Sequence, residues 1–188
     1  MRMVGGAFRG RTLAAPEDAS IRPTSDRVRE AMFNMLAHGA AAIDLDGVHV
    51  LDLFAGTGAL GLEALSRGAA QCLFVDDGAE ARGLIRDNVE AFGLTGVTKV
   101  FRRDATALGE AGKYGPYQLV FADPPYGKGL GERALASALA GGWLAPDATI
   151  VLEERRDAAI TLPAGLVLLD QRTWGETQAV FARFTSGA

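Results

Sequence analysis

Four consecutive residues, Asp123-Pro124-Pro125-Tyr126, form the feature of this sequence that is richest in chemistry. Two adjacent prolines fix the local backbone and leave no N–H groups to donate, so the Asp123 carboxylate and the Pro124 carbonyl form an array of acceptors. Such an array suits an exocyclic amino group of a nucleobase, because accepting its protons localises the lone pair on nitrogen. Tyr126 offers an aromatic face on which the base can stack. The turn therefore indicates amino methylation, with adenine, guanine and a side-chain amide all open as targets.

A glycine-rich turn over residues 52–61 supplies a cofactor-type motif. Gly56, Gly58 and Gly61 give the spacing G-x-G-x-x-G, and the acidic residue Asp76 lies 20 positions after Gly56. Glycines let the backbone turn sharply and approach a ligand closely. An acid at the end of the second strand can accept hydrogen bonds from ribose hydroxyls. The motif alone is compatible with NAD, a flavin nucleotide or S-adenosylmethionine.

The charge of the residues beside this turn distinguishes between the three possible ligands. Dinucleotides carry a pyrophosphate that a carboxylate would repel, whereas S-adenosylmethionine carries a sulfonium and an ammonium group. The carboxylate of Asp52, four residues before Gly56 and close to Phe54, therefore favours S-adenosylmethionine. Asp104, followed by Ala105, ends the third predicted strand. There it can hydrogen-bond an adenine amino group, cap the following segment, or do both.

These motifs need a sheet that brings several strand ends to one edge. Apolar runs of strand length alternate with helical patterns, which predicts strands at 48–54, 71–77, 97–103, 117–123 and 148–154 and helices at about 59–67, 79–92 and 130–140. Continuously apolar strands that alternate with helices predict an α/β fold with a largely parallel sheet covered on both faces. Two closing runs, 165–172 and 177–184, are separated by a short turn and predict an antiparallel hairpin at the sheet edge.

Residues 1–24 are expected to form a separate basic arm or small hairpin, followed by one globular domain over 25–188. The net charge of −4 argues against a uniformly basic surface, so contact with phosphates would need a local patch. The first eleven residues include Arg9 and Arg11 and no acid, and Arg22 follows. Scattered charge on a surface arm is the alternative interpretation.

A helix is expected to begin near Thr24 or Ser25, because either side chain can cap it. Val28, Met32 and Met35 then fall at helical spacing. Thr24, Ser25 and Arg27 could approach the pocket, or they could serve only to start this helix.

The composition, 48% hydrophobic and 22% charged, is that of a globular core, and no apolar run approaches the ~20 residues that span a bilayer. The opening residues lack the apolar segment of a secretory signal. Cys72 is the only cysteine and lies inside a predicted strand, which excludes a disulfide within one chain and favours packing over catalysis. His38 and His49 have no metal-ligand spacing. We expect a cytoplasmic protein with no metal and no membrane partner.

The two turns, the opening GGAFRGR, the segment RPTSDRVREAMFNML (22–36) and the closing WGETQAVFARF together resemble the bacterial RsmD family. The resemblance covers nearly the whole chain. Many amino-methyltransferases share the two turns, whereas RPTSDRVRE is more specific. The resemblance implies a seven-stranded, Rossmann-like methyltransferase fold with S-adenosylmethionine as donor. It also implies that the target is the N2 amino group of a guanine in 16S rRNA, guanine 966 in the usual rRNA numbering.

By position, the resemblance assigns Gly56 and Gly58 to the cofactor, Asp76 to its ribose, Asp104 to its adenine, and Asp123, Pro124 and Tyr126 to the target base. Arg9, Arg11 and Arg22 would then hold rRNA phosphates in the small subunit or an assembly intermediate. The family usually has Glu at the end of the second strand. Here Asp76 and Asp77 stand there, and either can be the ribose contact. Trp174-Gly175 replaces the usual Tyr-Gly of the closing hairpin.

Other functions explain only part of the sequence. A DNA adenine methyltransferase can use the same Asp-Pro-Pro-Tyr turn, but the chain has little room for a DNA target-recognition domain. A protein-glutamine methyltransferase would carry Asn in place of Asp123. An NAD-dependent oxidoreductase leaves the two prolines unexplained, and a non-catalytic RNA-binding assembly factor has no need of Asp123. Nothing in the sequence requires more than a monomer.

Overall fold

The computed structural model describes residues 1–18 and 24–186. These residues are arranged around a single mixed sheet. Within it, seven strands lie in the order β3-β2-β1-β4-β5-β7-β6. The strands are β1 (His49–Leu53), β2 (Gln71–Val75), β3 (Thr98–Phe101), β4 (Tyr117–Ala122), β5 (Leu144–Arg155), β6 (Leu166–Trp174) and β7 (Thr177–Phe184). The α-helices are α1 (Asp26–His38), α2 (Ala59–Ser66), α3 (Ala79–Ala91) and α4 (Leu130–Ala140).

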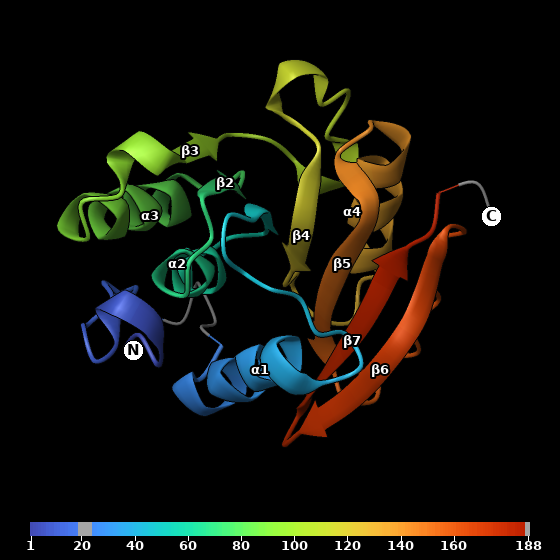
Figure 1. Cartoon of the computed structure of the whole chain (residues 1–188), viewed down its shortest axis with the longest axis horizontal. Helices are drawn as coiled ribbons and strands as arrows, with labels where there is room; N and C mark the ends of the chain where they lie inside the picture. The colour runs from blue at the N-terminus through green and yellow to red at the C-terminus, as the bar shows by residue number, and fades with distance from the viewer. Residues whose placement is uncertain (19–23, 187–188) are drawn as a thin grey trace.

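The strand pairing confirms the predicted α/β class. β1 pairs in parallel with β2 and β4, β2 with β3, and β4 with β5, whereas β7 runs antiparallel to both β5 and β6. The closing hairpin therefore forms the sheet edge (Figure 1). The chain extends the sheet from β1 toward β3 and then returns to place β4 on the other side of β1. This reversal creates the switch point at which open α/β sheets bind ligands.

Alternating side chains divide the core into two layers. In β1, Val50 packs with one cluster and Leu51 with the other, and Phe121 and Val120 divide in the same way in β4. The first cluster contains the apolar faces of α1, α2 and α3, and the second contains that of α4, so helices cover both faces of the sheet (Figure 1). Among the described residues, no helix is long and apolar enough to cross a membrane.

The strand boundaries lie within two residues of those expected, except that β5 begins four residues earlier. β3 ends at Phe101, because the chain then turns away and the Arg103 guanidinium donates to the carbonyl of Leu108 at 2.9 Å. β5 begins at Leu144 rather than near 148, since an irregularity carries the pairing past Asp147, whose φ is 62°. The early end of β3 leaves Asp104 three residues beyond the strand, whereas the change in β5 lies at its start, away from the acidic side chains near its other end.

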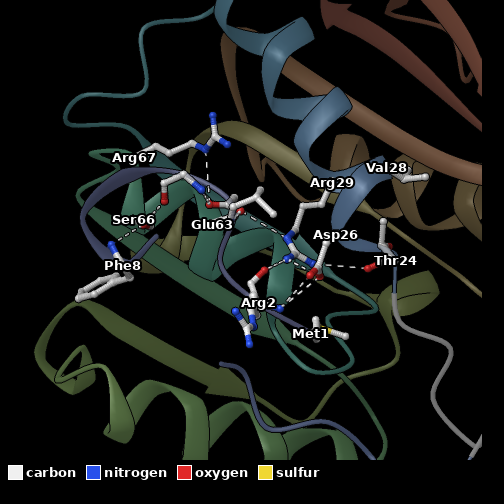
Figure 2. A network of polar contacts seen from close by, with 12 residues as sticks. Met1, Arg2, Phe8, Thr24, Asp26, Val28, Arg29, Glu63, Ser66 and Arg67 are labelled. Atoms are coloured by element: carbon white, nitrogen blue, oxygen red, sulfur yellow. Dashed lines mark hydrogen bonds and ion pairs between the residues drawn. The ribbon is translucent and has the colours of Figure 1, made fainter. Parts of the chain in front are cut away.

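The N-terminal segment packs on the domain through a buried polar network (Figure 2). The carboxylate of Glu63 on α2 accepts the backbone N–H groups of Val4 at 2.9 Å and Gly5 at 3.2 Å. Arg29 on α1 contacts the same carboxylate at 3.4 Å, and it also donates to the carbonyls of Arg2 and Thr24. The Arg29 and Glu63 side chains are fully buried, and each has a further ion-pair partner, Asp26 at 3.1 Å from Arg29 and Arg67 at 3.5 Å from Glu63. The network ties the first residues to the start of α1 and thereby positions Thr24.

Candidate active site

A cavity of about 1040 Å³ opens at the carboxyl ends of β1, β2, β4 and β5. It brings together the two turns that lie about 70 residues apart in the sequence. The predicted site residues that line it are Asp52, Phe54, Gly56, Asp76, Asp77, Asp123, Pro124 and Tyr126. The predicted residues Gly58, Asp104 and Ala105 are not among the lining residues.

The glycine turn holds its shape through backbone conformations and one carboxylate. Gly56 and Gly58 have φ values of 59° and 81°, in the left-handed region that favours glycine. Asp76 accepts the N–H of Gly56 at 2.9 Å and that of Gly78 at 2.8 Å. Each carboxylate oxygen has two lone pairs, so Asp76 retains acceptor capacity toward the cavity.

Gly61 lets α2 approach the sheet. A Cβ there would lie 2.5 Å from the Phe74 ring and 2.6 Å from the sulfur of Cys72, both on β2. The close approach aims the N–H of Gly61 at the Asp52 carboxylate, 3.0 Å away. Cys72 is buried in this contact and lies away from the cavity lining, in agreement with a packing role.

Asp52 is a buried acid that lines the cavity, with 1% of its surface exposed. Burial raises the pKa of Asp52 to about 8, the Gly61 N–H partly opposes this rise, and the charge of Asp76 adds to it. A cation bound in the cavity would favour the ionised carboxylate. The two carboxylates fit a cationic ligand with ribose hydroxyls, because Asp52 can offer a negative charge and Asp76 can accept hydrogen bonds.

A second group of polar side chains lies around Asp123, which follows β4 directly. The Thr24 hydroxyl oxygen lies 3.0 Å from Oδ2 of Asp123 and 2.9 Å from Oε2 of Glu153 on β5. The Tyr126 hydroxyl donates to Oε1 of Glu153 at 2.6 Å and lies 3.2 Å from the Thr177 hydroxyl. Burial, followed by the charge of Glu153, raises the pKa of Asp123 well above its usual value. Burial and the same charge also raise the pKa of Tyr126, so its phenol stays protonated.

Glu153 was not singled out in the sequence. It lies inside the predicted strand 148–154, and the strand pattern alone gives its final acids no role in a site. The pairing of Ala122 with Leu152 places Asp123, directly after β4, beside Glu153, two residues before the end of β5. An acid at the carboxyl end of a strand adjacent to β4 was the signal that could have identified it.

Asp104 and Ala105 have other partners in this structure. Oδ1 of Asp104 accepts the backbone N–H of Thr106 at 2.8 Å and its hydroxyl at 2.7 Å, so Asp104 caps a short 3₁₀ helix over Ala105–Ala107. These bonds lower the pKa of Asp104. The side chain is exposed, and Ala105 is buried in the core. Their assignment to the adenine stays a prediction.

The arginines predicted for phosphate contacts have different surroundings. Arg9 is exposed. The Arg11 guanidinium lies 4.4 Å from the centroid of the Phe92 ring and donates to the carbonyl of Ala91 at 2.7 Å, which ties the arm to the end of α3. Arg22 lies outside the described residues. The role of all three toward phosphates stays a prediction.

Comparison with known proteins assigns the chain to a family. Residues 1–183 match the family described as conserved hypothetical protein 95. The chain is 38% identical to "Ribosomal RNA small subunit methyltransferase D" of Escherichia coli (strain K12), over 94% of this chain and 86% of that protein. The chain belongs to the RsmD family. It is also 38% identical to "Putative rRNA methyltransferase YlbH" of Bacillus subtilis (strain 168), over 94% of this chain and 95% of that protein.

A solved structure shares the whole fold of this RsmD-family chain. "Putative methyltransferase yhhF from Escherichia coli" superposes with a TM-score of 0.83 at 32% identity, over 99% of this chain and 98% of that one. The methyltransferase fold expected from the resemblance is therefore confirmed.

Proposed function

We propose that this RsmD-family chain is an S-adenosylmethionine-dependent methyltransferase that modifies the N2 amino group of a guanine in small-subunit rRNA, at guanine 966 in the usual numbering. The observation that carries the proposal is one cavity lined by both the glycine turn with Asp52 and the Asp-Pro-Pro-Tyr turn. The E. coli relative named for small-subunit ribosomal RNA supports the choice of substrate.

The residues divide into two groups by chemistry. Asp52, Gly56 and Asp76 would hold the cofactor, which supplies an electrophilic methyl group when bound. Asp76 would accept from its ribose hydroxyls, and Asp77 lines the cavity as the alternative contact. Asp52 would offer its carboxylate to the cationic part.

At the Asp-Pro-Pro-Tyr turn, Asp123 and the Pro124 carbonyl would accept the amino protons of the target. The hydrogen bond from Tyr126 to Glu153 fixes its ring as a stacking face. A base within a duplex would first have to leave its stack to reach this depth. Holding the nitrogen in line with the methyl group then supplies the proximity contribution to the rate. We expect a monomer that acts in the cytoplasm on the small subunit or an assembly intermediate.

Transfer of labelled methyl groups tests this function. Small subunits that lack the modification, and their naked 16S rRNA, should be compared with duplex DNA, and the labelled nucleotide should be mapped. Label on N2 of one guanine is the expected result. Label on DNA adenine, with both RNA substrates unlabelled, would overturn the rRNA assignment. Calorimetry should show binding of S-adenosylhomocysteine and none of NAD. The opposite preference would overturn the cofactor assignment.

A further inference from the structure

Two acidic side chains from adjacent strand ends share one hydroxyl group at the target side of the cavity. The Thr24 hydroxyl oxygen lies 3.0 Å from Asp123 and 2.9 Å from Glu153, and Glu153 is only 3% exposed. A hydroxyl carries a single proton, so it can donate to only one carboxylate at a time. The second contact is a hydrogen bond only when one of the two carboxyl groups itself carries a proton.

Electrostatics also favours a state in which Asp123 and Glu153 together hold one proton. Two carboxylates that share a desolvated site cannot both ionise easily, and their protons leave in two steps that belong to the pair. Tyr126 donates to Glu153 at 2.6 Å and thereby stabilises one negative charge there. The charged or titratable groups that line the same cavity are Asp52 on β1, Asp76 and Asp77 after β2, Glu80 on α3, Arg27 on α1, Tyr126 on the turn and Glu176 in the closing hairpin, and Arg29 on α1 contacts the Thr24 carbonyl. The charge of Asp52 further disfavours a doubly ionised pair.

We propose that Glu153 is the proton-sharing partner of Asp123, and that the pair, which holds one proton in the free protein, takes up the proton that the target amino group releases. This inference rests on the proposed function. The target nitrogen forms a bond to the methyl carbon as the carbon–sulfur bond of the donor breaks, and that electron pair stays on sulfur. One N–H bond then breaks and its proton passes to the singly charged pair, which becomes neutral. Loss of one proton to solvent restores the starting state.

Glu153 therefore acts through Asp123 as a positioning residue, and the pair explains how a buried site handles the released proton. Without Glu153, Asp123 would have to accept the proton alone. A doubly protonated, neutral pair is favoured in a desolvated site, which gives the proton a stable position until the product leaves.

The experiment combines carboxyl carbon-13 NMR of the free protein with kinetics of Glu153→Gln, Glu153→Asp and the matched control Glu110→Gln, an exposed acid away from this cavity. In the wild-type protein, one carboxyl of the pair should titrate well above the usual carboxyl range. Glu153→Gln should return Asp123 toward its usual pKa and lower kcat by about 10²-fold or more, with KM for RNA within about threefold. Glu153→Asp should restore part of kcat, and Glu110→Gln should match the wild type.

The outcomes separate this inference from the function on which it rests. If both carboxyls titrate in the ordinary range, or if Glu153→Gln keeps kcat within threefold, the pair is wrong while rRNA methylation stands. If the wild-type protein shows the shared proton but methylates no RNA, the proposed function fails, and the proton-transfer role fails with it. Unchanged binding of S-adenosylhomocysteine by Glu153→Gln shows that the variant is folded.

Discussion

The hydroxyl of Tyr126 donates a 2.6 Å hydrogen bond to the carboxylate of Glu153, across 27 residues of sequence. The bond joins the Asp-Pro-Pro-Tyr turn to the adjacent strand β5. It therefore fixes the ring orientation of Tyr126 and supplies a donor to a buried charge. These two consequences can be separated by mutation.

Tyr126→Phe keeps the ring but removes this donor. Hydrogen bonds to charged groups contribute about 1.5–3 kcal/mol, so we expect kcat to fall by roughly tenfold to a hundredfold, with KM for RNA nearly unchanged. Tyr126→Ala also removes the stacking face and should raise KM. Steady-state kinetics on both variants checks this expectation. An equal rise of KM in Tyr126→Phe and Tyr126→Ala would mean that the hydroxyl itself contacts the RNA.

Asp123→Ala should abolish methyl transfer, by about 10³-fold or more, because it removes the predicted acceptor of the amino protons. Binding of S-adenosylhomocysteine should change by less than about threefold, since Asp52 and Asp76, rather than Asp123, are the predicted cofactor contacts. Calorimetry and single-turnover kinetics measure the two effects. A parallel loss of cofactor binding would move Asp123 from the target to the cofactor side.

Much of this site could be predicted from the sequence, because the carboxyl ends of parallel strands meet at one edge of the sheet. The apolar runs located the strands closely enough to place Asp52, Asp76 and Asp123 together. The neighbour with which each strand pairs was harder to predict from the sequence. Glu153 became significant only once β5 was known to lie beside β4 in a register that aligns Ala122 with Leu152. Long-range register depends on packing of both faces rather than on local pattern.

Local hydrogen bonds explain the other differences. Ser25 accepts the N–H of Val28 and caps α1, which leaves the Thr24 side chain to enter the cavity. The sequence offered both residues as caps and could not choose between them. Asp104 instead bonds to Thr106, two residues on. Such side-chain-to-backbone bonds compete with ligand contacts, and composition gives no measure of which prevails.

The raised pKa of Asp52 predicts a pH dependence of stability. Its pKa in the folded, ligand-free protein is about 8, above the ordinary value of 3.8, so the folded state binds the proton more tightly. Stability should therefore fall as pH rises from about 4 to about 8. Asp52→Asn should flatten this part of the curve, as measured by urea unfolding at several pH values. A slope that persists in Asp52→Asn would assign it to other groups.

The same group predicts how cofactor affinity varies with pH. A cationic ligand prefers ionised Asp52, so affinity for S-adenosylmethionine should rise between pH 6.5 and 8, by up to about tenfold per pH unit. Asp52→Asn should bind more weakly and lose this dependence. Calorimetry in matched buffers measures it. A pH-independent affinity in the wild-type protein would show that Asp52 does not contact the cation.

Loss of the buried Arg29–Glu63 ion pair should lower the stability of the fold, at a position outside the predicted catalytic residues. Removing one member of a buried pair costs about 3–5 kcal/mol, and Glu63→Ala would leave the buried Arg29 only its ion pair with the partly exposed Asp26. Glu63→Ala additionally removes the acceptor of the backbone N–H groups of Val4 and Gly5. We expect the free energy of unfolding to fall by that amount, as measured in urea. Glu30→Ala, an exposed change on α1, is the control and should be nearly neutral. Equal losses in both variants would contradict a specific role for the buried pair.

The N-terminal arm allows a test of RNA contact that is independent of catalysis. Arg9 is exposed, so Arg9→Ala should leave the fold intact. If Arg9 holds one phosphate, its removal should weaken RNA binding and reduce the slope of log K against log salt by about 0.7, the value for one contact to a single strand. Arg11→Ala would also remove the stacking on Phe92, so it should lower stability as well as binding. Filter binding at several salt concentrations measures the slopes, and unfolding measures the stability. An unchanged slope in Arg9→Ala, with full activity on small subunits, would remove the arm from the RNA interface.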